Sequence, residues 1–517
     1  MPALRNIFEF LQPTRRRLAL YVLLGVILAL MRFDSFPVGG YSDDAHYVVL
    51  AESLATGHGY RLINYPDQRP EPAFPPGWSL ILTPLAAIDP RNYTLLKLVP
   101  VASYLLSIPL CYALFARRLP PPYIDFLMAL IVLNPRIVGT SGMLMSEALY
   151  LCLSLFALVA FERWDRPENG RNKWLLLLAV ALALVAQLVR SIGLTLLVAM
   201  GIYLLMKVHW KRLLVIAGIV LVAAVPQVIF FARRGGTFIS SLYHSHIGWI
   251  LRGHLKEKEA WTDFVQNGAD TVGNMLLPIF GPRADAVAGS IGLDALPLVL
   301  TVLLLSLCLA GLIISLRRPT PTDLYTLAYS IILIVWIIYV GFIQFRMWIP
   351  LAPFMLYYMV IAIRAILTRF YPQRPRQAIY GTAVIALILA AAALRINIGD
   401  CQDPIRNRIF DLTAGAKWIQ EHTSESAVVM ARSPVSSYLY IDRKTVDYPA
   451  EDDTTLETLL VEEPDYIMVS PPLEIGNINE LDEFTRTNLL PALEASPDAF
   501  ELVYTNEKHN VRVFQVK

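Results

Sequence analysis

Long apolar runs separated by short polar segments fill the chain as far as residue 396. Runs of about 17–25 such residues are long enough to cross a bilayer as helices, and the pattern predicts about eleven of them. The predicted spans are residues 18–33, 93–115, 124–138, 143–161, 174–189, 192–208, 213–231, 296–316, 324–342, 348–367 and 379–396. Residues 1–396 are therefore predicted to form a polytopic α-helical membrane domain.

The pattern changes at residue 397, where charged residues become frequent and the apolar runs become short. LTAGAKWIQEH and LETLLVEE have helical periodicity, whereas SAVVMA, DYIMVS, AFELVYT and VRVFQVK are typical of strands. Residues 397–517 are thus predicted to form a small soluble α/β domain. Because no glycine-rich loop joins its strands to its helices, we expect it to have a structural or acceptor-docking role.

Composition agrees with a membrane protein, since 56% of the residues are hydrophobic and only 17% are charged. The 44 Lys and Arg residues nearly balance the 42 Asp and Glu residues, which argues against a nucleic-acid partner. The four cysteines have no paired spacing, so neither a disulfide framework nor a CxxC metal site is predicted.

Basic clusters fix the predicted orientation. RRR at residues 15–17, ARR at 116–118, KVHWKR and SLRRPT all fall on one side if the N-terminus is cytoplasmic, as the positive-inside rule requires. An odd number of spans then places the C-terminal domain outside, together with a first outer loop at 34–92 and a large outer loop at 232–295. The predicted location is the cell membrane.

The first outer loop contains the acidic pair Asp43 and Asp44, at the start of an amphipathic stretch. One interpretation is structural: Ser42 caps a helix, and the acids favour the positive end of its dipole. The other is catalytic, because this surface helix is followed by EPAFPPGWSLILTPLAAI, an apolar segment too short to span comfortably. Such a place suits a substrate that is half lipid and half polar.

Other charged residues lie at or near the predicted outer ends of spans. Glu147 lies about one turn inside an apolar run, so it should face a cavity or a partner. It either binds an acceptor or forms a buried pair with an arginine such as Arg136. Arg136, Arg190 and Arg346 either neutralise the phosphate of a donor or extend to lipid head groups.

A metal site is the least specific prediction. His46 follows Asp43 by three residues, and with His58 or the YHSHIGW loop it could supply ligands for Zn²⁺ or Mn²⁺. No HExxH-like spacing occurs, which favours hydrogen-bonding histidines instead. No cofactor is predicted with certainty, and the binding of a divalent metal ion is left as an alternative.

DDAHYVVLAESLATGHGY followed by FPPGWSLILTPL resembles the membrane-embedded glycosyltransferases of the GT-C superfamily, in particular the protein O-mannosyltransferases and the lipid A aminoarabinose transferases. LMSEALYLCLSLFALVAFERW, QLVRSIGLTLL and FRMWIPLAPFMLYY are similar to later segments of these enzymes. The resemblance implies transfer of a hexosyl or pentosyl unit from a polyprenyl-phosphate sugar donor to a hydroxyl of a lipid, glycan or protein acceptor, with inversion. It also implies that Asp43 is a general base. Asp44 stands where many members have Glu.

Two other functions compete with this interpretation. A lipid-linked glycan polymerase or ligase would depend on His244, His246, Arg252 and His254 in the large outer loop. A transporter would place charges at the membrane midplane and would have two matched halves. The charges here gather at one outer rim and no repeated halves are visible, which favours the transferase.

Overall fold

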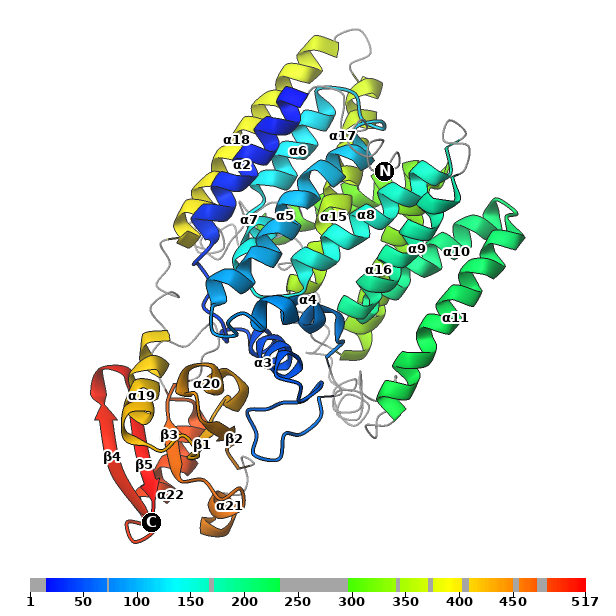
Figure 1. Ribbon diagram of the computed structural model, residues 1–517. Coiled ribbons are helices and arrows are strands. Elements are labelled where there is room, and N and C mark those ends of the chain that lie inside the picture. The colour runs from blue at the N-terminus through cyan, green and yellow to red at the C-terminus, as the bar shows by residue number, and fades with distance from the viewer. Residues whose placement is uncertain are drawn as a thin grey trace. The chain divides into compact units, whose positions relative to one another are not determined.

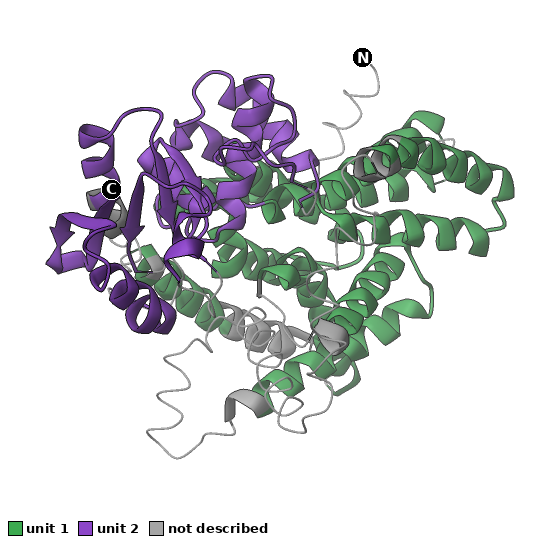
Figure 2. Ribbon diagram, turned by 90° about the horizontal axis from the view of Figure 1, so that it is seen from below, with its two compact units in different colours: residues 1–32, 99–142, 146–401 green, residues 33–98, 143–145, 402–517 purple. Residues whose placement is uncertain are grey.

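The computed structural model describes residues 15–71, 74–166, 172–232, 296–340, 345–370, 375–401, 409–449, 455–471 and 481–517. The chain forms two compact units, each assembled from separate stretches of sequence (Figure 2). Unit 1 comprises residues 1–32, 99–142 and 146–401, and unit 2 comprises residues 33–98, 143–145 and 402–517. The predicted first outer loop therefore belongs to the same compact unit as the C-terminal segment.

Unit 1 is helical. Its elements are α2 (Arg15–Arg32), α5 (Tyr93–Phe115, whose first residues belong to unit 2), α6 (Tyr123–Leu133), α7 (Pro135–Gly139), η1 (Thr140–Gly142), α8 (Glu147–Trp164), α9 (Lys173–Val189), η3 (Ser191–Gly193), α10 (Leu194–Met206), α11 (Trp210–Ala232), α15 (Leu296–Leu316), α16 (Pro321–Val340), η5 (Phe345–Leu351), α17 (Ala352–Phe370) and α18 (Pro375–Cys401). Every apolar run predicted to span overlaps one or two of these helices, although the run at 143–161 begins before its helix, in residues that belong to unit 2. Helices α2, α6 and α18 lie side by side (Figure 1).

Three of the described helical stretches are long and apolar enough to cross a membrane, namely Tyr93–Phe115, Val299–Leu316 and Arg346–Phe370. The pair Tyr123–Leu133 and Pro135–Gly142, bent by 44°, would make a fourth span if it crosses as one unit. Other apolar helices, such as Lys173–Val189, are shorter. The total of about eleven spans stays a prediction.

The predicted span at 124–138 is broken at Asn134, because Pro135 lacks an N–H group and disfavours a helical backbone in the residue before it. Asn134 has an extended backbone, and its side chain accepts hydrogen bonds from the backbone N–H groups of Arg136 and Ile137 at 3.0 and 3.2 Å. A helix break inside an apolar region is stable when other groups satisfy the exposed backbone.

Two side chains satisfy the carbonyl groups at this break. Tyr104 donates to the Val132 carbonyl at 3.1 Å, and Asn397 donates to the Leu133 carbonyl at 3.0 Å. Asn397 is fully buried within α18, which continues to Cys401. The predicted domain boundary at residues 396/397 therefore falls inside a helix, and unit 2 resumes only at residue 402.

Unit 2 joins two helices of the first outer loop to a mixed sheet. Its elements are α3 (Asp43–Ala55), α4 (Gly77–Ala86), α19 (Ile409–His422), β1 (Val428–Ala431), α20 (Pro434–Ile441), β2 (Lys444–Val446), α21 (Leu456–Leu460), β3 (Tyr466–Val469), η7 (Thr485–Leu489), α22 (Leu490–Glu494), β4 (Phe500–Asn506), η8 (Glu507–His509) and β5 (Val511–Val516). The strand order is β2-β1-β3-β5-β4. Strand β1 is parallel to β2 and β3, whereas β5 is antiparallel to β3 and β4.

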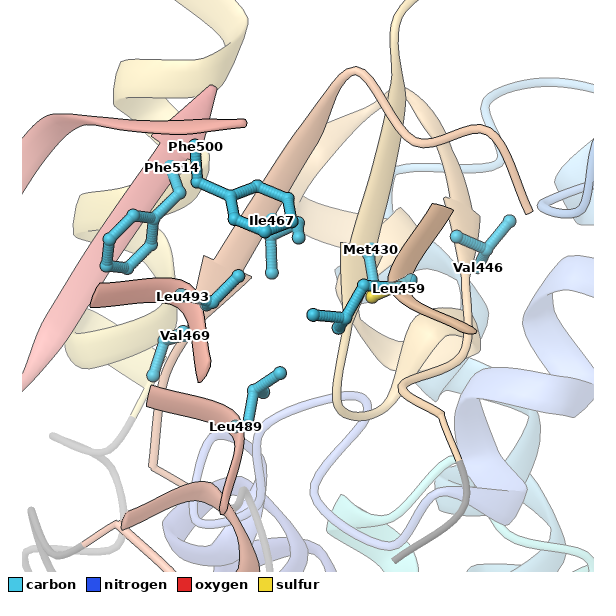
Figure 3. Close-up of a cluster of buried hydrophobic side chains, with 9 residues drawn as sticks. All are labelled: Met430, Val446, Leu459, Ile467, Val469, Leu489, Leu493, Phe500 and Phe514. Atoms are coloured by element: carbon cyan, nitrogen blue, oxygen red, sulfur yellow. The ribbon is translucent and has the colours of Figure 1, made fainter. Parts of the chain in front are cut away.

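Both faces of this sheet are covered, which explains why the short strands β1 and β3 are almost continuously apolar. Helices α19 and α20 contribute Ala416, Ile419 and Ile441 to the core on one face. Figure 3 shows the cluster on the other face, to which α21 and α22 contribute Leu459 and Leu493. Its members are Met430, Val446, Leu459, Ile467, Val469, Leu489, Leu493, Phe500 and Phe514.

Candidate active site

The Asp44 carboxylate is built into the turn that precedes α3. Its Oδ2 accepts a hydrogen bond from Gly39 N at 2.8 Å, and its Oδ1 accepts from Ala45 N at 3.0 Å and Tyr41 N at 3.3 Å. The residue is 2% exposed. Burial raises the pKa of Asp44 to about 6 against the opposing effect of these backbone donors, and the Asp43 charge also raises it. These three hydrogen bonds indicate that Asp44 stabilises the turn.

Helix capping at this position differs from the predicted arrangement. Ser42 makes no capping hydrogen bond through its side chain, and its φ is 59°. The backbone turns before α3, with Gly39 at a φ of +91°, a conformation that favours glycine. Because of this turn, the Asp44 carboxylate meets the N–H groups of residues before its own helix as well as that of Ala45.

Asp43 is the first residue of α3, and its N–H donates to the Tyr41 carbonyl at 2.6 Å. Its side chain is only partly buried, in contrast to that of Asp44. A general base must come within about 2.6–3.2 Å of the proton that it removes. Of the two acids, Asp43 is therefore the one whose exposure suits contact with an incoming hydroxyl group.

The two candidate histidines both make local contacts. His46 Nδ1 lies 3.0 Å from the Ser42 carbonyl oxygen, and its ring stacks on Phe74 with the centroids 4.8 Å apart. His58 Nδ1 lies 2.9 Å from Thr56 Oγ1. Within the described part of the chain, no three His, Cys, Asp or Glu side chains are grouped as a metal site would require. Metal binding by His46 and His58 stays a prediction.

Glu147 and Arg190 form a buried ion pair in unit 1. Arg190 Nη1 lies 2.6 Å from Glu147 Oε1 and 2.9 Å from Ser146 Oγ. Glu147 is the first residue of α8 and is 1% exposed, whereas Arg190 has an extended backbone just after α9. Glu147 Oε2 has no hydrogen-bond partner among the residues that the structure describes. The predicted pairing thus occurs, with Arg190 as partner.

The remaining predicted site residues lie on other short segments. Arg136 is in α7, directly after the helix break, and Arg346 is in η5. Both are partly exposed members of unit 1, and their donor-phosphate role stays a prediction. His244, His246, Arg252 and His254, on which the polymerase or ligase interpretation depends, lie outside the described residues.

Three contacts were not predicted, one in unit 1 and two in unit 2. Ser146, the neighbour of Glu147 in the sequence, is a second partner of Arg190. Trp78 of the PPGW motif is fully buried, donates to the Leu144 carbonyl at 3.1 Å, and packs edge-on against Tyr47. The PPGW motif signalled the importance of Trp78, but its partner 66 residues away could not be read from the sequence.

Comparison with solved structures defines the class of fold. The chain shares its fold with ArnT, a GT-C lipid A aminoarabinose transferase, which is one of the families that its motifs resemble. One solved structure is that of ArnT from Cupriavidus metallidurans bound to undecaprenyl phosphate, with a TM-score of 0.59 and 13% identity over 96% of this chain and 97% of that chain. The apo form of the same ArnT gives a TM-score of 0.58 and 14% identity over the same shares.

A weaker likeness links the chain to the mycobacterial arabinofuranosyltransferase AftD, with a TM-score of 0.48 and 13% identity over 98% of this chain and 40% of that chain. No protein-family model matches the sequence, and no curated protein sequence matches it significantly. At 13–14% identity, the likeness to ArnT establishes the fold.

Proposed function

We propose that this protein is an integral membrane glycosyltransferase. It moves a monosaccharide from a polyprenyl-phosphate donor to an acceptor hydroxyl on the extracytoplasmic face of the cell membrane, with inversion at the anomeric carbon. The observation that carries the proposal is the likeness to ArnT, solved with undecaprenyl phosphate bound, over 96% of this chain and 97% of that chain. Because the likeness includes the C-terminal segment as well as the helical part, it supports a function that uses the whole chain.

Asp43 is the proposed general base. A hydroxyl is a poor nucleophile until a carboxylate takes its proton in the transition state, which contributes typically 10²–10⁴-fold to the rate. In the proposed step, the acceptor oxygen bonds to the anomeric carbon, the bond from that carbon to the phosphate oxygen breaks, and Asp43 receives the proton. The partial exposure of Asp43 and the full engagement of Asp44 support this division of roles.

The leaving group is a polyprenyl phosphate, which needs no proton if cations neutralise its charge. Arg136, Arg190 and Arg346 are the proposed cations, because guanidinium groups bind phosphate oxygens through paired hydrogen bonds. Glu147 holds Arg190 through Oε1 and retains Oε2 as an acceptor for a hydroxyl of the bound sugar or acceptor.

The test uses purified full-length protein in lipid vesicles with labelled donors. We expect a polyprenyl-phosphate monosaccharide to be consumed with release of polyprenyl phosphate, and a diphosphate-linked oligosaccharide to remain intact. Consumption of the oligosaccharide alone would contradict the proposal and favour the polymerase or ligase. Passage of solute across sealed vesicles without any sugar transfer would favour the transporter. A panel of hexosyl and pentosyl donors would then identify the sugar.

A further inference from the structure

Helix α20 of the C-terminal segment packs against α3 of the first outer loop, within unit 2 (Figure 1). Two of its side chains donate hydrogen bonds to the turn that precedes α3. Ser436 Oγ, on a residue that is 1% exposed, donates to the Gly39 carbonyl at 3.1 Å. Tyr440 donates through its hydroxyl to the carbonyl of Val38.

Gly39 connects these contacts to the acidic pair. Its carbonyl accepts from Ser436, while its N–H donates to Asp44 Oδ2 at 2.8 Å. A Cβ atom on Gly39 would lie 3.3 Å from the Ser436 Cβ, which is a tight contact. Glycine at this position therefore lets α20 pack closely against the turn. The segment Val38–Gly39 is thus bonded to α20 through its carbonyl groups and to Asp44 through the Gly39 N–H group.

The ring of Tyr440 packs against the apolar core beneath α19 and α20, which anchors its hydroxyl group to the sheet. The other end of α3 is held by the same helix, because Tyr438 donates to Glu52 Oε1 at 3.2 Å. Arg91 reinforces this end with ion pairs of 3.6 Å to Glu52 and 3.1 Å to Asp442. Helix α3 is therefore fixed at both ends by α20 and the residue that follows it.

Strand β2 extends these contacts along the loop. Thr445 N donates to the Asn64 carbonyl at 2.8 Å, and Asn64 Nδ2 donates to Thr445 Oγ1 at 3.2 Å. Tyr65 donates through its hydroxyl to Asp447 Oδ2 at 2.9 Å. The segment from α20 to Asp447 thus contacts the loop on both sides of Asp43 in the sequence.

We infer that α20 is a positioning element for the proposed catalytic base, acting through Ser436 and Tyr440 on the turn that begins α3. The inference rests on the proposed function, in which Asp43 removes the acceptor proton. A catalytic group displaced by about 1 Å can lose about 10²-fold in rate. Loosening this turn should therefore reduce turnover while leaving donor binding nearly unchanged, because the proposed role of Asp43 is to take the acceptor proton and not to bind the donor.

The experiment compares the double variant Ser436→Ala/Tyr440→Phe with Tyr448→Phe in the full-length protein. Tyr448 is a matched control, since it also donates from a phenol to a backbone carbonyl, that of Met468 at 2.7 Å, and packs on the core of the other sheet face. We expect the double variant to lose about 10-fold or more in kcat at a donor KM within about twofold of wild type. Hydrogen exchange should accelerate at Gly39, Tyr41 and Ala45.

The control should match wild type in both measurements. Unchanged exchange at Gly39, Tyr41 and Ala45 in the double variant would overturn the inference, whatever the activity. Faster exchange with unchanged kcat would also overturn it, because the turn would then have no influence on Asp43. A wild-type protein that uses no polyprenyl-phosphate donor would instead overturn the proposed function, and the exchange data would still decide whether α20 holds the turn.

Discussion

Two buried carboxylates in this protein are stabilised in opposite ways. Asp44 in unit 2 accepts three hydrogen bonds from neutral backbone N–H groups, whereas Glu147 in unit 1 faces the Arg190 guanidinium at 2.6 Å. Neutral donors solvate a charge without introducing another, so a neutral replacement leaves no unpaired charge, only backbone N–H groups that lose an acceptor. An ion pair is different, because removal of one partner leaves the other charge with its desolvation cost. The two sites should therefore respond differently to the same type of substitution.

The largest effect is expected for Glu147→Gln, which leaves Arg190 without its counter-ion. The loss of stability should be about 3 kcal/mol, the lower end for breaking a buried pair, because Arg190 is partly exposed. Thermal unfolding of the purified protein in detergent measures it. The double variant Glu147→Gln/Arg190→Met should recover most of the loss. Equal destabilisation in the single and double variants would show that the pair is not what stabilises this site.

Asp43→Asn should have the next largest effect, and on turnover instead of stability. Asparagine is itself compatible with the first turn of a helix, so the fold should change by less than about 1 kcal/mol. Loss of a general base should reduce kcat by about 10²-fold or more, with donor binding retained. Steady-state transfer assays with a binding measurement separate the two effects. Near-normal transfer by well-folded Asp43→Asn protein would show that Asp43 is not the general base and has only a structural role.

The free energy of unfolding should depend on pH because the Asp44 carboxyl is buried and its pKa is raised. Its folded-state pKa of about 6 lies above the unfolded value of about 3.9, so the folded protein holds this proton more tightly. Stability contributed by Asp44 is therefore present at low pH and decreases as the pH rises from about 4 to about 6, by up to about 3 kcal/mol. Unfolding measurements across this range should show a decrease in wild type that Asp44→Asn lacks. A decrease of equal size in both proteins would assign it to other groups.

The smallest effect is expected on the turnover of Asp44→Asn at neutral pH. The asparagine oxygen can still accept backbone hydrogen bonds, and the variant has no buried charge to desolvate, but the amide nitrogen cannot replace the second acceptor, so at least one of the three backbone N–H groups loses its partner. We expect kcat to fall by less than about 10-fold, well short of the loss in Asp43→Asn, because the remaining oxygen still accepts from part of the turn. The same transfer assay used for Asp43→Asn measures it. A loss as large as that of Asp43→Asn would mean that both acids take part in the chemistry.

The sequence by itself predicted the helical apolar runs, the strands β1, β3, β4 and β5 and the set of candidate site residues, but not strand β2. These features follow from a local rule, because apolar residues at helical or alternating spacing predict an element wherever it lies. The acidic pair and the PPGW motif likewise mark the first outer loop through residue types alone.

Only the tertiary structure decided which groups these residues meet. Glu147 pairs with a residue 43 positions away, and Ser436 reaches a carbonyl 397 positions away. Asn397, predicted to begin a soluble domain, instead satisfies a carbonyl at the break in another helix. Periodicity reports which side of an element is apolar, but the choice of partner depends on contacts between distant segments, and a single sequence contains no local signal for them.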